Sequence, residues 1–172
     1  MYNYIIVGAG SAGCVLATRL TENPNISVCL LEAGGPDKSV FIHAPAGVAA
    51  MLPTKINNWA FETVPQKGLN GRKGYQPRGK TLGGCSSTNA MLYVRGNKWD
   101  YDNWSAQGNK GWSYEEVLPY FKKSEGNEYF SNQYHNQDGP LGVSNATAAS
   151  NTNDMFIASC QEQGLKQNDD YN

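Results

Sequence analysis

The sequence contains no run of basic residues and few charged residues of either sign. Asp, Glu, Lys and Arg make up 17% of the 172 residues, and the formal net charge is -1. A protein that binds nucleic acid through the phosphate backbone needs a basic stripe or patch. Nucleic acid is therefore not an expected partner.

The sequence also lacks a long apolar run. No stretch approaches the roughly 20 apolar residues of a membrane-spanning helix. The chain begins MYNYIIVGAG, without the basic flank of a signal peptide, and carries no lipidation motif. We expect a cytoplasmic protein and leave open a peripheral association with the inner face of a membrane.

Cysteine and histidine are scarce. The four cysteines lie far apart and form no CxxC pair, so neither a metal site nor a disulfide framework is expected. His43 follows a proline-rich excursion and His135 lies in a polar loop. We expect structural or surface roles for both, and assign no catalytic residue within this chain.

Glycine, by contrast, is plentiful, and its first cluster lies inside a strand, helix, strand pattern. YIIVGAG predicts a buried parallel strand, SAGCVLATRLTEN a helix that ends at Asn23-Pro24, and ISVCLLEAGG a second buried strand. This pattern is a βαβ unit. It predicts the α/β fold class.

Gly8, Gly10 and Gly13 form a GxGxxG motif between the first strand and the helix. Gly8 makes the tight turn, Gly10 lets the backbone approach a pyrophosphate, and Gly13 allows close packing. The helix N-terminus favours phosphate, and Glu32, after the second strand, can accept hydrogen bonds from a ribose. The pattern predicts dinucleotide binding and leaves NAD and FAD open; the alternative is a Gly-rich turn without a chemical role.

Prolines are scattered through residues 34–78, where we expect excursions and short helices. Further helices are predicted around Ser87–Tyr93, from Ser113 as N-cap with Glu116 three residues later, and over Thr152–Gly164. Pro119 would interrupt the second of these helices.

Two further segments carry weaker signals. DGPLGVS, residues 138–144, predicts a turn and a short strand, and Asn145–Asn153 a loop.

A second Gly-rich run, RGKTLGGCSSTNA, favours FAD over NAD. A simple NAD-linked fold would continue after Glu32 into alternating strands and helices, whereas this chain passes through an irregular stretch first. An enclosed flavin needs backbone donors from a separate segment. Gly83 and Gly84 permit close approach, and three side chains can donate hydrogen bonds, namely Ser86, Ser87 and Asn89.

At these residues the chain resembles the N-terminal part of the glucose-methanol-choline (GMC) flavoprotein oxidoreductases, most closely the choline dehydrogenase-like branch. The segments that carry the resemblance follow the family's order: IIVGAGSAGCVLATRL, LLEAGG, NWAFETVPQ, RGKTLGGCSSTNAMLYVRGNKWDYDNW and DGPLGVS. The resemblance covers essentially the whole chain. It implies a three-layer, Rossmann-like FAD-binding domain, incomplete here and carrying irregular lid segments.

The resemblance also implies which residues bind FAD. One set would hold the pyrophosphate and the adenosine end: Gly8, Gly10, Ser11, Ala12, Gly13, Glu32 and Ala33. A second set would line the phosphate and isoalloxazine side: Gly79, Leu82, Gly83, Gly84, Asn89, Ala90 and Met91. Trp59 resembles an aromatic near the cofactor lid, with a buried core Trp as the alternative.

Two positions depart from the family's usual pattern. Cys85 stands where Ser or Gly is usual, and we expect a small packing residue there. Thr88 precedes the Asn at a position where some choline-oxidising relatives carry a His bonded covalently to the flavin. Thr88 cannot form that bond, so we expect noncovalent FAD.

Members of the family oxidise an alcohol by hydride transfer from the CH–OH carbon to flavin N5, and pass the electrons to oxygen or a quinone. The resemblance implies that the base that removes the hydroxyl proton is a His near the C-terminus of a much longer chain, beyond Asn172. We therefore expect residues 1–172 to be the N-terminal FAD-binding segment of a longer enzyme, inactive in isolation. The alternatives are a noncatalytic nucleotide-binding module, or another FAD enzyme that shares only the βαβ unit. The alcohol itself stays open.

Overall fold

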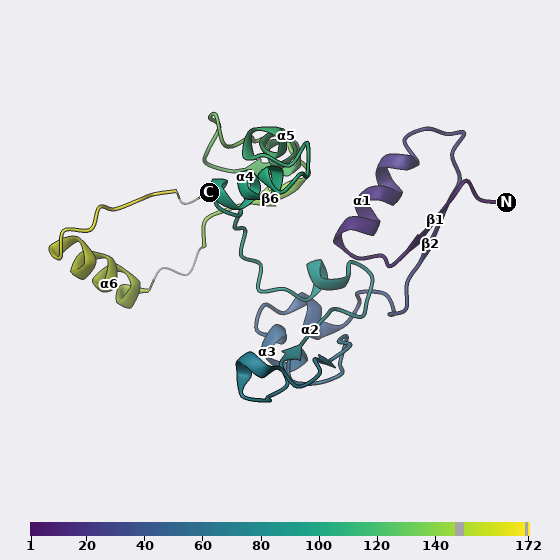
Figure 1. Ribbon diagram of the computed structural model, residues 1–172, viewed down its shortest axis with the longest axis horizontal. Helices are drawn as coiled ribbons and strands as arrows, with labels where there is room; N and C mark the ends of the chain where they lie inside the picture. Colours follow the sequence, from purple (N-terminus) through teal and green to yellow (C-terminus); the bar gives the residue numbers. More distant parts are fainter. Residues whose placement is uncertain (147–149, 171) are drawn as a thin grey trace. The chain divides into compact units, whose positions relative to one another are not determined.

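The computed structural model describes residues 1–146, 150–170 and 172, and these divide into two compact units (Figure 1). Unit 1 is Met1–Leu92 and unit 2 is Tyr93–Asn172. Both Gly-rich motifs lie in unit 1.

Unit 1 begins with the predicted strand, helix and strand. β1 (Tyr4–Val7) pairs in parallel with β2 (Val28–Leu31), with Tyr4 opposite Val28, and α1 (Ser11–Leu20) packs on both strands. Parallel strands require such a crossover connection. The predicted βαβ unit is confirmed.

The two strands are not buried, contrary to the prediction from their apolar sequence. Ile5 is 66% exposed and Val7 is 84% exposed. The reason is that, among the described residues, α1 is the helix packed on these strands and no third strand pairs with them. Buried parallel sheets are covered on both faces. The α/β class holds, and the three-layer arrangement stays a prediction.

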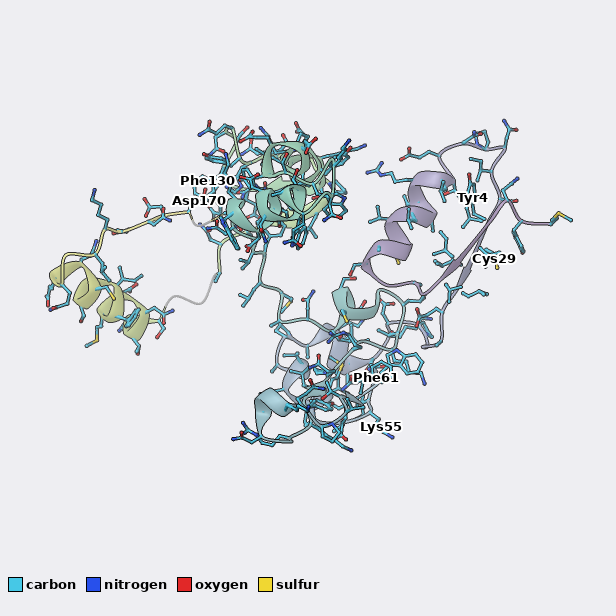
Figure 2. The ribbon with its side chains drawn as sticks, in the orientation of Figure 1. Tyr4, Cys29, Lys55, Phe61, Phe130 and Asp170 are labelled. Atoms are coloured by element: carbon cyan, nitrogen blue, oxygen red, sulfur yellow. The ribbon has the colours of Figure 1, made fainter. Side chains whose placement is uncertain are left out.

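The segment between β2 and the second Gly-rich motif is irregular, as its prolines predict. It contains the short helices α2 (Val40–His43) and α3 (Gly47–Met51). The antiparallel strands β3 (Phe61–Glu62) and β4 (Tyr75–Gln76) follow, with the 3-10 turn η1 (Lys67–Leu69) between them. The Phe61 side chain marks β3 in Figure 2.

The helix predicted over Ser87–Tyr93 is wrong. One 3-10 turn, η2 (Gly84–Ser87), is followed by irregular chain. Met91 has a left-handed φ of 59°, and its N–H donates to Asn89 Oδ1 at 2.7 Å. This local bond competes with helical hydrogen bonds and ends the helical path.

Unit 2 contains α4 (Lys98–Ala106), which the sequence analysis missed. Its N-cap was the available signal: Asn97 Oδ1 accepts from Trp99 N at 2.9 Å, and Asp100 Oδ2 accepts from Asn97 N at 2.9 Å. This reciprocal pairing is a capping box. Residues 98–106 therefore form a helix where the sequence analysis predicted no element.

The helix α5 (Tyr114–Ser124) begins after Ser113, as predicted, and packs against α4. Pro119 lies inside α5 and does not interrupt it. The capping box and packing on α4 outweigh the hydrogen bond that a proline ring removes. The predicted interruption is therefore wrong.

In the rest of unit 2, the described residues form two parallel strands and one helix. β5 (Glu125–Asn127) pairs with β6 (Leu141–Val143), the predicted short strand. α6 (Asn151–Glu162) confirms the last predicted helix, and its N-cap Ser150 accepts from Thr152 N at 3.2 Å.

The loop predicted over Asn145–Asn153 is wrong at residues 151–153, which form the first turn of α6, and residues 147–149 lie outside the described residues. Among the helices of the described ranges, none is long and apolar enough to cross a membrane.

Candidate cofactor-binding site

The two Gly-rich motifs meet in unit 1. Gly83 N donates to Ala9 O at 2.7 Å, and a Cβ on Gly84 would lie 2.9 Å from Gly10 Cα. The segments are distant in sequence, yet they form one continuous backbone surface. The structure therefore brings the two predicted sets of cofactor residues together.

Gly13 makes the close approach that the motif predicts. A Cβ on Gly13 would lie 2.0 Å from Gly8 O, well inside contact distance. Gly8 itself has a φ of 97°, a conformation that side chains rarely permit, and its N–H donates to Leu31 O at 2.7 Å. These contacts fix the turn between β1 and α1 against the end of β2.

Gly10, by contrast, faces open space. No atom lies within 4 Å of a Cβ placed on Gly10. It is also the N-cap of α1, and among the described residues no side chain accepts a hydrogen bond from the first backbone N–H groups of this helix. Ser11 and Ala12 are exposed in the first turn. The helix therefore presents uncapped backbone and its positive dipole end to this space, an arrangement that fits a phosphate group.

Glu32 is bound to the backbone on both of its oxygens. Oε2 accepts from Ala9 N at 2.8 Å, and Oε1 accepts from Gly34 N at 2.8 Å. A carboxylate retains further lone pairs, so the predicted ribose contact stays a prediction. Glu32 has a second role that the sequence analysis missed, because it ties the first glycine loop to the end of β2. The next predicted residue, Ala33, is exposed beside it.

The second motif is also fixed to the segment after β2 by a short parallel bridge between Thr81 and Gly35. Thr81 is fully buried, and its Oγ1 donates to Gly35 O at 3.0 Å. Leu82 N donates to the same carbonyl at 2.9 Å. Gly79 lies inside the resulting loop, where a Cβ would be 2.2 Å from Gly84 O.

The predicted side-chain donors of this loop are used within it. Ser86 Oγ donates to Gly83 O at 2.6 Å and Ser87 Oγ to Leu82 O at 2.7 Å. Asn89 Nδ2 donates to Ser86 O at 3.4 Å. These groups shape the loop, and their contact with a cofactor stays a prediction. Both Ala90 and Met91, which follow, are exposed.

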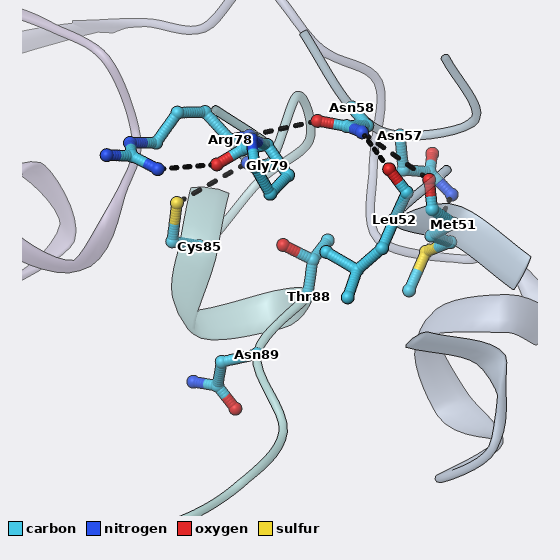
Figure 3. A pocket seen from close by; sticks show the side chains of 10 residues that line it. Met51, Leu52, Asn57, Asn58, Arg78, Gly79, Cys85, Thr88 and Asn89 are labelled. Carbon is cyan, nitrogen blue, oxygen red and sulfur yellow. Dashed lines mark hydrogen bonds between the residues drawn. The ribbon is translucent and has the colours of Figure 1, made fainter. Parts of the chain in front are cut away.

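A cavity of about 180 Å³ lies beside this loop (Figure 3). Thr88, Asn89 and Cys85 contribute from the second motif, while Met51 and Leu52 contribute from the end of α3. Cys85 is exposed, and its Sγ accepts from Gly79 N at 3.4 Å. It lines a cavity wall, so the prediction of a simple packing residue is incomplete.

A second cavity, of about 230 Å³, lies on another side of the same loop. It is lined by Ser86, Ser87 and Met91, together with Asp37 and the exposed His43 of α2. Both cavities therefore adjoin residues of the second Gly-rich motif.

Trp59 is not a buried core residue, so that alternative is wrong. The residue is 39% exposed, and its ring stacks on Phe61 with centroids 5.5 Å apart. Lys80 Nζ lies 4.4 Å from the ring centroid, within cation–π range. A place near a cofactor lid stays a prediction.

Unit 2 holds a largely buried chain of ionisable side chains that the sequence analysis missed. Arg95 Nη2 lies 2.6 Å from Glu125 Oε2, and Glu125 Oε1 lies 2.8 Å from His135 Nδ1. His135 Nε2 lies 2.8 Å from Asp170 Oδ2. We name these four residues the unit 2 charge chain. His135 is 2% exposed, so the structural role expected for it holds and the surface role does not.

Glu125 is the centre of this chain. Burial opposes its ionisation, but hydrogen bonds from Asn127 and His135 and the charge of Arg95 outweigh burial, so the pKa of Glu125 lies below its ordinary value. No sequence pattern reveals these pairings, because the four residues come from separate segments.

The comparison with curated proteins extends over the whole chain. The chain is 47% identical over 173 residues to an alcohol dehydrogenase [acceptor] of Pseudomonas putida, a match that covers 100% of this chain and 31% of that protein. It is 46% identical to an oxygen-dependent choline dehydrogenase of Photobacterium profundum, covering 99% of this chain and 30% of the relative. The chain thus spans about a third of the length of the curated relatives it matches.

The solved structures agree with these relatives. Pyridoxine 4-oxidase from Mesorbium loti matches with a TM-score of 0.87 and 34% identity, over 96% of this chain and 33% of that one. An FAD-dependent oxidoreductase from Chaetomium thermophilum matches with a TM-score of 0.81 and 33% identity, over 96% and 30%. Residues 2–172 match the family described as GMC oxidoreductase. This match extends far beyond the βαβ unit. The chain belongs to the GMC oxidoreductase family.

Proposed function

We propose that this chain is the N-terminal, FAD-binding segment of a longer oxidoreductase that oxidises an alcohol. Support comes from the family and from relatives named as alcohol and choline dehydrogenases, about a third of whose length the chain spans. The observation that carries the proposal is the junction of the two Gly-rich motifs, where Gly83 binds Ala9 beside the uncapped N-terminus of α1.

The residues at this junction fit the parts of FAD. The backbone of Gly8 and of residues 10–13 would hold the pyrophosphate, and Glu32 with Ala33 would hold the adenosine end. The second motif would line the flavin side through backbone and apolar groups. This set is Gly79, Leu82, Gly83, Gly84, Asn89, Ala90 and Met91.

When bound, FAD would accept at N5 the hydride removed from the alcohol CH–OH carbon. This chain's residues hold and orient the cofactor. Among the described residues, both ring nitrogens of His135 face carboxylates at 2.8 Å, and the exposed His43 is expected in a structural or surface role, so we assign neither histidine the hydroxyl proton. The base belongs to another part of the enzyme in this proposal, as do most contacts to the alcohol. Electrons would leave to oxygen or a quinone.

FAD is bound without a covalent link in this proposal. Thr88, beside Asn89 in the second motif, has no side-chain group that could form a histidyl bond to the flavin. If protein expressed from the full reading frame kept its flavin in the pellet after acid precipitation, this part of the proposal would be wrong.

The test of the function is spectroscopic. Protein from the full reading frame is purified, and its visible absorbance is recorded before and after addition of choline, aliphatic, aromatic and polyol alcohols. We expect a flavin spectrum that is bleached without oxygen by at least one alcohol class. Absence of bound flavin after incubation with FAD would contradict the proposal.

A further inference from the structure

We infer that Asn58 is a positioning residue that sets the width of the 180 Å³ cavity beside the second Gly-rich motif, and thereby the fit of the flavin side of FAD. The inference rests on the proposed function for the identity of the occupant. Its structural basis is a set of hydrogen bonds around one buried carboxamide (Figure 3).

The carboxamide of Asn58 binds two opposite sides of the cavity. Nδ2 donates to Thr54 O at 2.8 Å and approaches Leu52 O at 3.2 Å, both in the turn that follows α3. On the other side, Oδ1 accepts from Arg78 N at 2.9 Å, at the start of the second motif. Because one planar group bonds to both sides, its size fixes their separation.

The strand region is fastened to the same group. Asn58 Nδ2 donates to Tyr75 Oη at 2.9 Å, and that hydroxyl donates in turn to Leu52 O. Asn58 Oδ1 also accepts from Ala60 N at 3.0 Å. Asn58 is only 6% exposed, so these partners replace water almost completely.

The backbone around Asn58 is held in an unfavourable conformation. Ala60 has a φ of 51°, in the left-handed region that most side chains disfavour, and Asn57 has a φ of 50° in the same region, which asparagine adopts more readily. Such strain persists where the surroundings impose it, and it gathers at functional sites. Here the conformation is imposed by the side chain of Asn58 and by two backbone hydrogen bonds. Trp59 N donates to Arg78 O at 2.9 Å, and Lys80 N donates to Asn57 O at 2.8 Å.

The cavity wall opposite α3 consists of residues of the second motif, Cys85, Thr88 and Asn89. A change at Asn58 would therefore move Arg78 and Gly79, from which this motif continues. Asn58 lines the cavity without offering it a free polar atom, since its amide groups are engaged. Asn58 therefore affects the cavity by holding the residues that line it in place.

The decisive variant is Asn58→Asp in protein from the full reading frame. The shape is kept, but both N–H donors are lost and an anion faces the carbonyls of Leu52 and Thr54. We expect the dissociation constant for FAD to rise about tenfold or more, the usual cost of loosening the supporting shell of a bound group. The visible circular dichroism of the bound flavin should change as well.

The matched control is Asn70→Asp. Asn70 also has a left-handed φ, of 53°, but it is exposed at the end of η1 and does not line the cavity. It should leave FAD affinity and the flavin spectrum unchanged. If N58D lowers the melting temperature but keeps wild-type FAD affinity and spectrum, Asn58 is only structural and the inference is overturned.

Two further measurements keep the inference testable. If N58D does not fold, Tyr75→Phe removes one hydrogen-bond partner of Asn58, and unchanged FAD affinity in Y75F would overturn the inference.

If wild-type protein binds no FAD, the proposed function fails. The role of Asn58 is then tested by the alkylation rate of Cys85, measured by peptide mass spectrometry. That rate should rise in N58D against N70D; an equal rate would overturn the cavity role.

Discussion

At the scale of single residues, glycines in one motif have different tasks. A side chain on Gly13 would collide with the carbonyl of Gly8, whereas a side chain on Gly10 would meet only open space. Gly13 therefore serves the packing of the protein itself. Gly10 leaves a space that the described residues do not fill.

This difference predicts opposite effects for two equal substitutions. Gly13→Ala should destabilise the protein by about 2 kcal/mol or more, because backbone must move to admit the methyl group. Gly10→Ala should leave stability within about 0.5 kcal/mol, and should weaken FAD binding about tenfold or more by filling the space a pyrophosphate needs. Urea unfolding without cofactor and FAD titration measure the two quantities.

The comparison is internally controlled because both variants add one methyl group within the same motif. Equal loss of stability in the two variants would show that Gly10 is a packing residue. Unchanged FAD affinity in G10A would place the cofactor elsewhere.

At this scale, the hydrogen-bond partners of individual side chains could not be predicted from the sequence. The hydroxyls of Ser86 and Ser87 donate within their own loop, and the oxygens of Glu32 accept from Ala9 and Gly34. A sequence indicates which groups can bond. It does not indicate which acceptor lies nearest, because that depends on the path of the backbone.

At the scale of elements, the capping box of α5 is a local device that the sequence predicts well. Ser113 Oγ and Ser113 N donate to Glu116 Oε2 at 2.6 and 3.0 Å. The hydrogen bond from the Ser113 side chain, followed by that from its backbone, lowers the pKa of Glu116 below its ordinary value of 4.5. The partners are three residues apart, so no tertiary contact is needed.

A lowered pKa in the folded state gives a defined pH dependence. Glu116 contributes stability above its unfolded pKa of 4.5, and this contribution is lost as the pH falls through the lower, folded value. Glu116→Gln should therefore lower the melting temperature near neutral pH, and the difference from wild type should shrink on acidification. Thermal melts of both proteins across this range measure it.

Ser113→Ala serves as the partner variant, since it removes the side-chain donor and should reproduce part of the same trend. A melting-temperature difference that is constant with pH would show that the bond to Glu116 does not stabilise α5.

Elements without such local signals were predicted less well. The apolar residues after Ser87 suggested a helix, but the bond between Met91 N and Asn89 Oδ1 turned the chain away. Pro119 suggested a break, but α5 continues through it against α4. In both cases a contact outranked the intrinsic preference of a residue.

At the scale of the molecule, the unit 2 charge chain joins segments from most of that unit. Arg95 precedes α4, Glu125 begins β5, His135 lies in the following loop, and Asp170 lies near the end of the chain. Asn172 strengthens the closure, since its Oδ1 accepts from Arg95 N at 2.7 Å. Among its described residues, unit 2 is therefore held together by these polar contacts together with the buried Tyr114 and Val117 of α5.

Glu125→Gln should destabilise the protein by about 3 to 5 kcal/mol, because it leaves Arg95 buried without its anion. Since the pKa of Glu125 is lowered, its contribution is present above 4.5 and is lost as the pH falls through the folded value. Urea unfolding at several pH values should show the variant's deficit diminishing in acid.

Glu128→Gln is the matched control, because Glu128 is exposed three residues away and takes part in no ion pair of the described residues. It should change stability by less than about 0.5 kcal/mol. Equal effects of E125Q and E128Q would contradict a central role for the charge chain.

The sequence by itself determined the βαβ unit, the positions of both glycine motifs and the capping box at Ser113, because each depends on spacing within a short stretch. Only the tertiary structure decided that Gly83 meets Ala9, that Asn58 spans a cavity, and that His135 lies between two carboxylates. Those contacts join residues far apart along the chain. Their partners are selected by how the backbone folds back on itself, which no local pattern encodes.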